Sequence, residues 1–150
     1  MKYLPDYKLL GAAQLDELRS VLENECMPTT DLTDARADFF RFHEEGKILG
    51  YAGIEGQGAD LLLRSLWISP QQRNHGTGAR VLERIENLAS ERGGKSLHLL
   101  TTTAERFFLR HGYIQQERAK APSSIAESRE FQNLCPASAV YLAKSLRSRI

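Results

Sequence analysis

The loop at residues 73–78 restricts the fold of this chain more than any other part of the sequence. It connects the apolar run Leu61 to Ile68, typical of a strand covered on both faces, to the amphipathic segment Ala79 to Ser90, which has helical spacing. Gly76 and Gly78 carry no side chain, so the main chain there can approach an anion closely. The start of the following helix adds N–H groups without partners. The loop therefore predicts a phosphate-binding turn between a buried strand and a helix.

The spacing of the glycines excludes two common phosphate loops. A dinucleotide-binding fingerprint needs a third glycine, and a P-loop needs Gly-Lys followed by Ser or Thr. The loop sequence RNHGTG and the helix after it have neither feature. A tight connection without any ligand is the alternative interpretation of the loop taken alone.

Length, charge and composition limit the class of protein further. With 150 residues and 41% hydrophobic side chains, residues 1–150 are expected to form one domain with a sizeable core. A net charge of +1 argues against a broad basic surface for nucleic acid or for an anionic membrane. The start of the chain has no signal-peptide core and no apolar run approaches membrane-spanning length, so we expect a soluble, cytoplasmic protein. The two cysteines and four histidines lack the spacing of a disulfide framework or a metal site.

The hydrophobic pattern predicts alternating helices and strands without internal repeats. Leu15, Leu18 and Leu22 form an apolar helical stripe, and Pro28 follows it as a stop signal. Aromatic side chains on either side of a glycine-containing turn favour a hairpin. The expected elements are a strand in Tyr3–Leu10, a helix in Ala12–Glu25, a short helix or loop in Thr29–Arg36, a hairpin of Asp38–His43 and Lys47–Glu55 around residues 44–46, and strands in Leu61–Ile68, Leu97–Thr102 and Ser138–Lys144.

Two motifs together resemble one known family. The loop matches the pattern [Q/R]-x-x-G-x-[G/A] through Arg73, Gly76 and Gly78, and the segment Ala104 to Tyr113 looks like A-x-x-F-[Y/F]-x-x-x-G-[F/Y]. Both resemble segments of the GCN5-related N-acetyltransferases, and they occur here in the same order as in that family. The resemblance extends over nearly the whole chain. It implies an α/β (α+β) fold with a mixed, mainly antiparallel sheet of about six to seven strands and helices on both faces.

Three further segments resemble the arsenic-resistance branch of this family. They are residues 62–66, residues 99–104, and the stretch from Arg129 to Ala139. The resemblance implies an acetyl-CoA-dependent N-acetyltransferase acting on a small-molecule amine, with an arsenical or phosphinic amino acid analogue as a candidate acceptor. A protein lysine or N-terminal acetyltransferase and a non-catalytic acetyl-CoA-binding regulator are the alternatives. A homodimer is compatible with the sequence.

The resemblance assigns the acetyl-CoA site mainly to backbone groups. N–H groups around Leu66 would stabilise the oxyanion that develops on the acetyl carbonyl, and the adjoining strand residues would bind the pantetheine arm. The glycine loop would hold the pyrophosphate, with Arg73 adding a charged hydrogen bond. For the side chains of Asn74 and His75, solvated loop residues are the favoured alternative explanation. The implied cofactor-binding residues are Trp67, Ile68, Arg73, Asn74, His75, Gly76, Thr77, Gly78, Ala79, Phe107 and Phe108.

One position departs from the family pattern. Phe108 stands where relatives usually have a tyrosine that protonates the departing thiolate, and it has no dissociable proton. Thr101 matches a position where many relatives have asparagine, so its hydroxyl is a candidate catalytic hydrogen-bonding group or an ordinary strand-end residue. A thiol with a pKa of about 8.5 is already a fair leaving group, so water can suffice. Tyr51, Tyr113 and Tyr141 are either proton-relay candidates or packed tyrosines.

Arg64 is the first candidate for binding the acceptor. A cation inside an apolar strand needs a partner, either an anionic group of the substrate or an internal acid such as Asp60 or Glu55. Ser65 would add a donor. Arg129 and Cys135 are further substrate-binding candidates, with a solvated helix residue and a rigid strand entry as their structural explanations.

Overall fold

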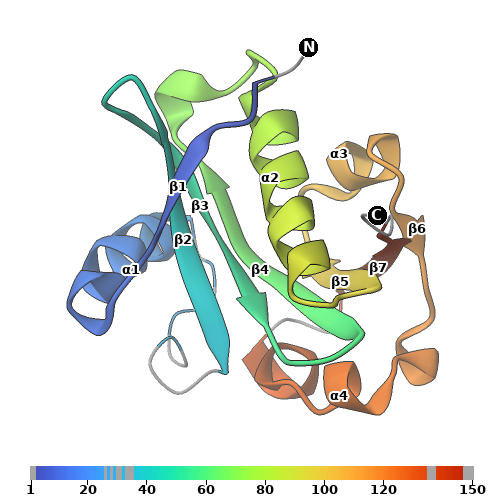
Figure 1. Ribbon diagram of the computed structural model, residues 1–150. Coiled ribbons are helices and arrows are strands. Elements are labelled where there is room, and N and C mark those ends of the chain that lie inside the picture. The colour runs from blue at the N-terminus through green and yellow to red at the C-terminus, as the bar shows by residue number, and fades with distance from the viewer. Residues whose placement is uncertain are drawn as a thin grey trace.

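The computed structural model describes residues 3–25, 27, 29, 32, 36–134 and 138–146 (Figure 1). The strands are β1 Asp6–Leu9, β2 Ala37–Glu44, β3 Lys47–Glu55, β4 Asp60–Ile68, β5 Ser96–Thr101, β6 Ile114–Gln115 and β7 Val140–Ser145. They form one seven-stranded sheet in the order β1-β2-β3-β4-β5-β7-β6. Within this sheet β4 and β5 are parallel and the other neighbours are antiparallel. The expected mixed, mainly antiparallel sheet is confirmed.

Helices cover both faces of this sheet. They are α1 Leu15–Asn24, α2 Thr77–Glu91, α3 Glu105–Arg110 and α4 Ser123–Ala126, with a π-helical turn at Glu130–Leu134. Leu18 and Leu22 of α1 pack against Phe39 and Tyr51 on one face. Because successive strand residues point to opposite faces, Phe40 lies on the other face, against α2.

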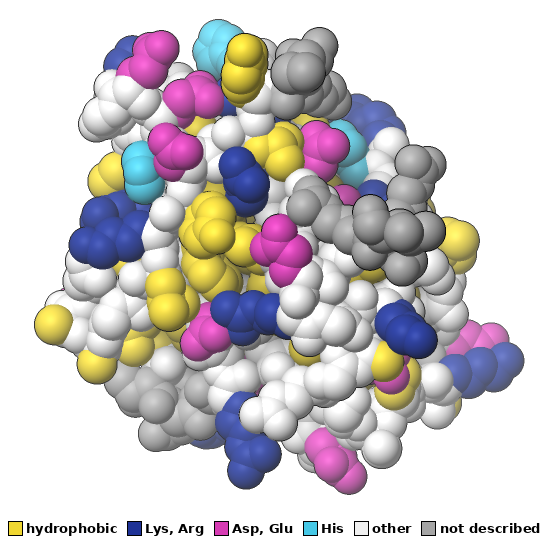
Figure 2. All heavy atoms as spheres, in the orientation of Figure 1, with side chains coloured by type: hydrophobic (Ala, Val, Ile, Leu, Met, Phe, Trp, Pro, Cys, Tyr) yellow, Lys and Arg dark blue, Asp and Glu magenta, His cyan; other side chains and the backbone are white. Residues whose placement is uncertain are grey.

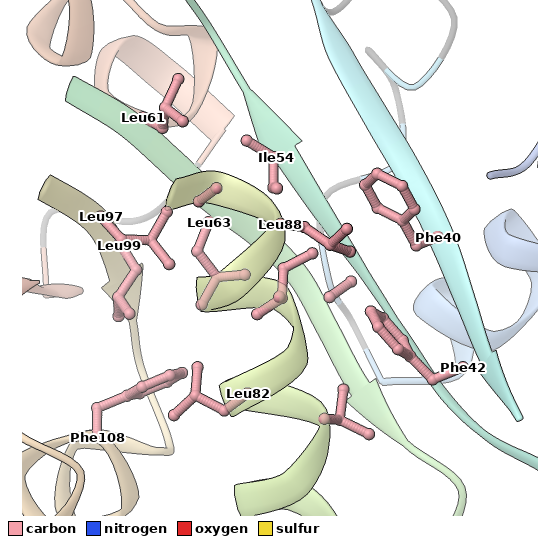
Figure 3. Packing of buried hydrophobic residues seen from close by; sticks show 14 of the residues in the cluster. Phe40, Phe42, Ile54, Leu61, Leu63, Leu82, Leu88, Leu97, Leu99 and Phe108 are labelled. Carbon is pink, nitrogen blue, oxygen red and sulfur yellow. The ribbon is translucent and has the colours of Figure 1, made fainter. Parts of the chain in front are cut away.

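The larger core lies between α2 and the sheet (Figure 3). Leu82 and Leu88 of α2 contribute to the buried cluster together with Phe40, Phe42, Leu63 and Leu97 from three strands. The buried α2 positions recur at helical spacing, as the sequence pattern predicts. Phe108 of α3 belongs to the same cluster (Figure 3), so this core fixes α3 beside α2.

Several boundaries differ from the sequence prediction. The first strand is limited to Asp6–Leu9, and the first helix opens as a 3-10 turn at Ala12–Gln14 before α1 begins. Glu44 belongs to β2, so the hairpin turn is Glu45-Gly46, with φ of 52° and 76° at these residues. Two consecutive positive φ values suit the right-handed twist of paired strands. Much of the expected helix or loop at residues 29–36 lies outside the described residues.

The sheet opens between its two parallel strands. β4 and β5 are paired only from Asp60 to Leu62 and from Ser96 to His98. Further along, β4 stays paired with β3 but contains a bulge, because the register shifts between Tyr51 and Gly53 of β3. Ser65 on the bulge has a φ of 60°, a conformation that non-glycine residues rarely adopt. The C-terminal half of β4 therefore has an edge that β5 does not cover.

Candidate active site

A cavity of about 1100 Å³ lies where β4 and β5 part. Its walls come from four regions of the chain: the C-terminal half of β4, the loop before α2, the end of β5 with the following turn, and α3. Glu25, Met27, Glu130 and Ala139 complete the lining. The predicted catalytic and cofactor residues Leu66, Trp67, Ile68, Thr101, Phe107 and Phe108 all line this one space.

The bulge in β4 decides which backbone groups face the cavity. Ser69 donates its N–H to the Leu49 carbonyl of β3, at 2.9 Å. Alternation along an antiparallel pair then directs the backbone groups of Trp67 to β3 and those of Ile68 to the opposite edge. The Ile68 carbonyl accepts a hydrogen bond from Arg73 Nε at 2.8 Å, as expected for a group that points away from β3. The open edge of β4 thus offers the peptide groups of Ile68 to the cavity, directly after the bulge at Ser65 and Leu66.

The loop before α2 has room for an anion at its glycine. Gly76 has a φ of 74°, precedes the first residue of α2, and has no atom within 4 Å of the place where a β-carbon would stand. Gly78 is different, because a β-carbon there would lie 3.2 Å from the ring of Phe107. Gly78 therefore permits close packing of α3 on α2. Of the predicted loop residues, Arg73, Asn74, Gly76, Gly78 and Ala79 line the cavity, whereas His75 and the buried Thr77 do not.

Arg73 connects the loop to the end of α1. Its Nη2 donates to Glu25 Oε1 at 2.8 Å while its Nε is bound to the Ile68 carbonyl. The hydrogen bond and the charge of Arg73, aided by a hydrogen bond from Trp67, hold the pKa of Glu25 below its ordinary value. Glu25 was not among the sequence candidates. No local motif marks it, since its partner is 48 residues away in the chain.

Thr101 and Phe108 have clear local environments. The Thr101 hydroxyl oxygen accepts a hydrogen bond from the Ala104 N–H at 3.0 Å, immediately before α3. The ring of Phe108 is buried and makes edge contacts with the rings of Phe107 and Tyr113. The position where the family usually has a tyrosine thus belongs to the core and also lines the cavity.

The three tyrosines considered as proton relays lie away from the cavity lining. The hydroxyl of Tyr51 donates to Glu17, and that of Tyr113 donates to Glu86, each at 2.8 Å. Burial raises the pKa of both hydroxyls above the ordinary range, and the adjacent glutamates raise it further. The Tyr141 hydroxyl lies 2.7 Å from His98 Nδ1. These contacts match the interpretation of packed tyrosines with satisfied hydroxyls.

At the other end of the cavity, Arg64 is held by internal acids. Its side chain is fully buried, its Nη1 donates to Glu55 Oε1 at 3.0 Å, and its Nε lies 3.3 Å from Glu130 Oε2. The guanidinium also stands over the ring of Phe39. The sequence left either a substrate anion or an internal acid as the partner of Arg64. In the structure an internal acid, Glu55, is bound to it. Asp60 instead lies 3.0 Å from His98 Nε2.

The remaining substrate candidates fall in different places. Ser65 lines the cavity beside Arg64, whereas Arg129 is exposed and outside the cavity lining. Cys135 lies outside the described residues. Glu130, the residue after Arg129, is buried and lines the cavity, but it was not among the sequence candidates. The sequence carries no signal for it, because the π-helical turn that begins at Glu130 decides which of two adjacent charged residues faces inward.

A metal-binding cluster and a membrane-spanning helix were both sought in the part of the chain that the structure describes. No group of three or more His, Cys, Asp or Glu in those ranges could hold a metal ion. None of the described helices combines the length and apolar character that crossing a bilayer requires. Figure 2 shows acidic and basic side chains interspersed on one face of the molecule.

Comparison with known families agrees with the fold and the two motifs. The family described as "Acetyltransferase (GNAT) domain" matches residues 35–115, which include the glycine loop, both parallel strands and α3. The chain belongs to the GNAT acetyltransferase domain family.

The relatives in sequence match it over part of their length. An amino-acid acetyltransferase of Pseudomonas syringae pv. tomato is 37% identical over 70 residues, which are 47% of this chain and 16% of that protein. An uncharacterized N-acetyltransferase of Chlorobaculum tepidum is 33% identical over 89 residues, or 59% of this chain and 57% of that protein. The chain thus spans about a sixth of the first relative and little more than half of the second.

Solved structures with the same fold cover almost the whole chain. N-acetylglutamate synthase from Neisseria gonorrhoeae, complexed with coenzyme A and L-arginine, superposes with a TM-score of 0.76 at 16% identity, over 97% of this chain and 34% of that one. Tetrahymena GCN5 gives a TM-score of 0.73 at 12% identity, over 97% of this chain and 98% of that one. At these identities the similarity concerns the fold.

Proposed function

We propose that this protein transfers the acetyl group of acetyl-CoA to the amino group of a small, amino-acid-like molecule. The observation that carries the proposal is a single cavity that joins a bulged, uncovered edge of β4 to an open glycine turn at the start of α2. A thioester with a long pantetheine arm and a pyrophosphate needs both features at once. Membership of the GNAT family and the name of the Pseudomonas relative agree with this chemistry.

The residues present fit acetyl-CoA. The open space at Gly76, the N–H groups at the start of α2 and its dipole suit the pyrophosphate. The peptide groups of Ile68 suit the pantetheine amides, although the Ile68 carbonyl must then exchange or share its bond with Arg73. Phe107 and Phe108 supply an apolar wall to the same cavity.

The chain supplies positioning and charge stabilisation. Bound acetyl-CoA would provide an activated acetyl group, whose C–S bond is replaced by a C–N bond to the amine. Backbone N–H groups next to the bulge at Leu66 would donate to the carbonyl oxygen as negative charge grows on it. The amine must lose one proton, and the carboxylate of Glu130 lines the cavity at the end away from the glycine loop. The lowered pKa of Glu25 keeps its carboxylate charged near neutral pH, which suits it for holding Arg73 of the loop in place.

The nature of the acceptor is the narrower part of the proposal. The arsenical and phosphinic amino acid analogues require an anion contact, for which Arg64 and Ser65 line the cavity. An anion reaching Arg64 must compete with Glu55 and Glu130, which already hold the guanidinium. Amino groups meet two carboxylates in the same cavity. Recognition of the acceptor by its amino group is therefore better supported than recognition by an anionic group. Whether the acceptor also needs an anionic group is the question for experiment.

A panel of acceptors tests this function. We expect release of the CoA thiol, measured with a thiol reagent, when small amino acids, arsenical or phosphinic analogues, or their matched carboxamides are added with acetyl-CoA. A preference of about tenfold or more in kcat/KM for the anionic member of each pair would indicate a contact worth about 1.4 kcal/mol. Turnover restricted to lysine-containing or N-terminal peptides would contradict the small-molecule assignment in favour of a protein acetyltransferase.

A second candidate, a regulator that binds acetyl-CoA without turnover, is favoured by Phe108. The position that usually supplies the acid has no proton to give.

If chemistry proceeds without an acid at this position, Phe108→Leu should keep kcat within about threefold, while lost packing lowers the free energy of unfolding by about 1–2 kcal/mol. Single-turnover rates at saturating acetyl-CoA and a denaturant titration measure the two effects. Binding of acetyl-CoA to the unmodified protein, with no release of the CoA thiol in the presence of any acceptor, would favour the regulator.

A further inference from the structure

The charged side chains that line the cavity differ in whether they have an opposite charge nearby. Glu25 is paired with Arg73, and Glu130 lies beside Arg64. Two other arginines of the lining, Arg106 and Arg110, take part in no ion pair and no side-chain hydrogen bond within the described ranges. Both are exposed, so a ligand can reach them. The cavity therefore has unneutralised positive charge at its α3 wall.

The positions of these two arginines on α3 are not independent. They are four residues apart, which places them on the same face of the helix, one turn from each other. Like charges at this spacing repel each other, and a shared anion would relieve the repulsion. Neither arginine was selected by a sequence motif.

Packing holds α3, and with it the two arginines, next to the phosphate loop. The ring of Phe107 lies against Gly78, in the first turn of α2, and the ring of Phe108 is fixed in the core. Phe107 also packs on His111, whose Nδ1 is bound to the Phe107 carbonyl at 2.7 Å. The basic face is consequently rigidly connected to the start of α2 and continues the same cavity.

The chemistry of CoA explains why two phosphate-binding regions are needed. Its pyrophosphate suits the backbone N–H groups of the glycine turn, but its ribose also carries a 3′-phosphate monoester that is nearly dianionic at neutral pH. A dianion in partly exposed surroundings is best recognised by guanidinium groups, which bind phosphate oxygens with two parallel hydrogen bonds.

We propose that Arg106 and Arg110 form a subsite for the 3′-phosphate of CoA, by which the protein distinguishes CoA from dephospho-CoA. This inference rests on the proposed function, because it assumes that the pyrophosphate occupies the loop before α2. The subsite selects the donor and leaves the acceptor end, with Arg64 and Glu130, unaffected.

Calorimetric binding of CoA and dephospho-CoA to the complete chain tests the subsite without any turnover. We expect the unmodified protein to bind dephospho-CoA about tenfold more weakly than CoA. In the variant carrying both Arg106→Ala and Arg110→Ala, the Kd for CoA should rise to the value for dephospho-CoA, while the Kd for dephospho-CoA stays unchanged. Lysine at both positions should restore part of the discrimination, because it returns the charge without the planar fork.

A matched control removes two positive charges elsewhere. Arg19 and Arg92 are paired with surface acids and do not line the cavity, so the Arg19→Ala and Arg92→Ala double variant should keep the full preference for CoA. Equal affinity of the unmodified protein for both ligands would overturn the subsite and leave the proposed function standing, as would a preference that persists without Arg106 and Arg110. Failure of the unmodified protein to bind either ligand would overturn both proposals.

Discussion

Gly76→Val is expected to weaken acetyl-CoA binding by about a hundredfold, the largest effect on affinity in this protein. The valine side chain would fill the open space beside the start of α2 where the pyrophosphate is proposed to lie. Loss of two charge-assisted hydrogen bonds, each contributing about 1.5 kcal/mol or more, accounts for a change of this size. Calorimetry on the folded variant measures it.

The hairpin glycine Gly46 provides a matched control for this substitution. Its φ of 76° is close to the 74° of Gly76, and at both positions the space where a β-carbon would stand is free of other atoms within 4 Å. Valine at either glycine therefore imposes similar backbone strain, about 1–2 kcal/mol or more, in similar free space. Gly46→Val should lose stability but keep its affinity for acetyl-CoA. Equal affinities of the two variants would exclude the loop as the pyrophosphate site.

The second large effect concerns stability. Arg64→Met should lower the free energy of unfolding by about 3–5 kcal/mol, because Glu55 and Glu130 would lose the buried guanidinium that they share. For a domain of this size, such a loss corresponds to a decrease in Tm of roughly 6–20 °C. Thermal and denaturant unfolding followed by circular dichroism measure both quantities.

Arg92 provides the control for Arg64. Each arginine stands over a phenylalanine of β2 and is paired with an acid, but the side chain of Arg92 is 36% exposed whereas that of Arg64 is fully buried. Arg92→Met should therefore cost less than about 1 kcal/mol, as is usual for exposed ion pairs. A similarly small loss for Arg64→Met would show that the ion pair with Glu55 does not hold β3 and β4 together. Arg64 would then be available as an anion-binding residue.

The ion pairs also explain how the acceptor end differs from the donor end of the cavity. Arg64 is engaged by Glu55 and Glu130 at the end of the cavity away from the glycine loop, so this end offers the carboxylate of Glu130 to an incoming ammonium. The α3 wall presents Arg106 and Arg110, which form no ion pair within the described ranges. This separation of charge along one cavity would orient acetyl-CoA with its phosphates toward α3 and its thioester toward the bulge in β4.

The sequence by itself determined those strands, turns and helices whose hydrophobic pattern or turn residues lie within the segment itself. The apolar run of β4, the glycine turn and the helical stripe of α2 follow one another along the chain, and their periodicity does not depend on distant residues. For the same reason, the place of Gly76 before α2 and the missing hydroxyl at Phe108 could be predicted. The two motifs also predicted the mixed sheet that the structure contains.

Only the tertiary structure decided which charged groups meet. The sequence left two possible partners for Arg64, a substrate anion or an internal acid. The strand register decides to which face its side chain points, and a one-residue shift would reverse that face. Pairing of β3 with β4 brought Glu55 to it, and the π-helical turn brought in Glu130 rather than Arg129. Glu25 meets Arg73 across 48 residues. Contacts of this kind depend on how separate elements pack, so local spacing determined the cofactor loop, whereas packing determined the charges around the reacting groups.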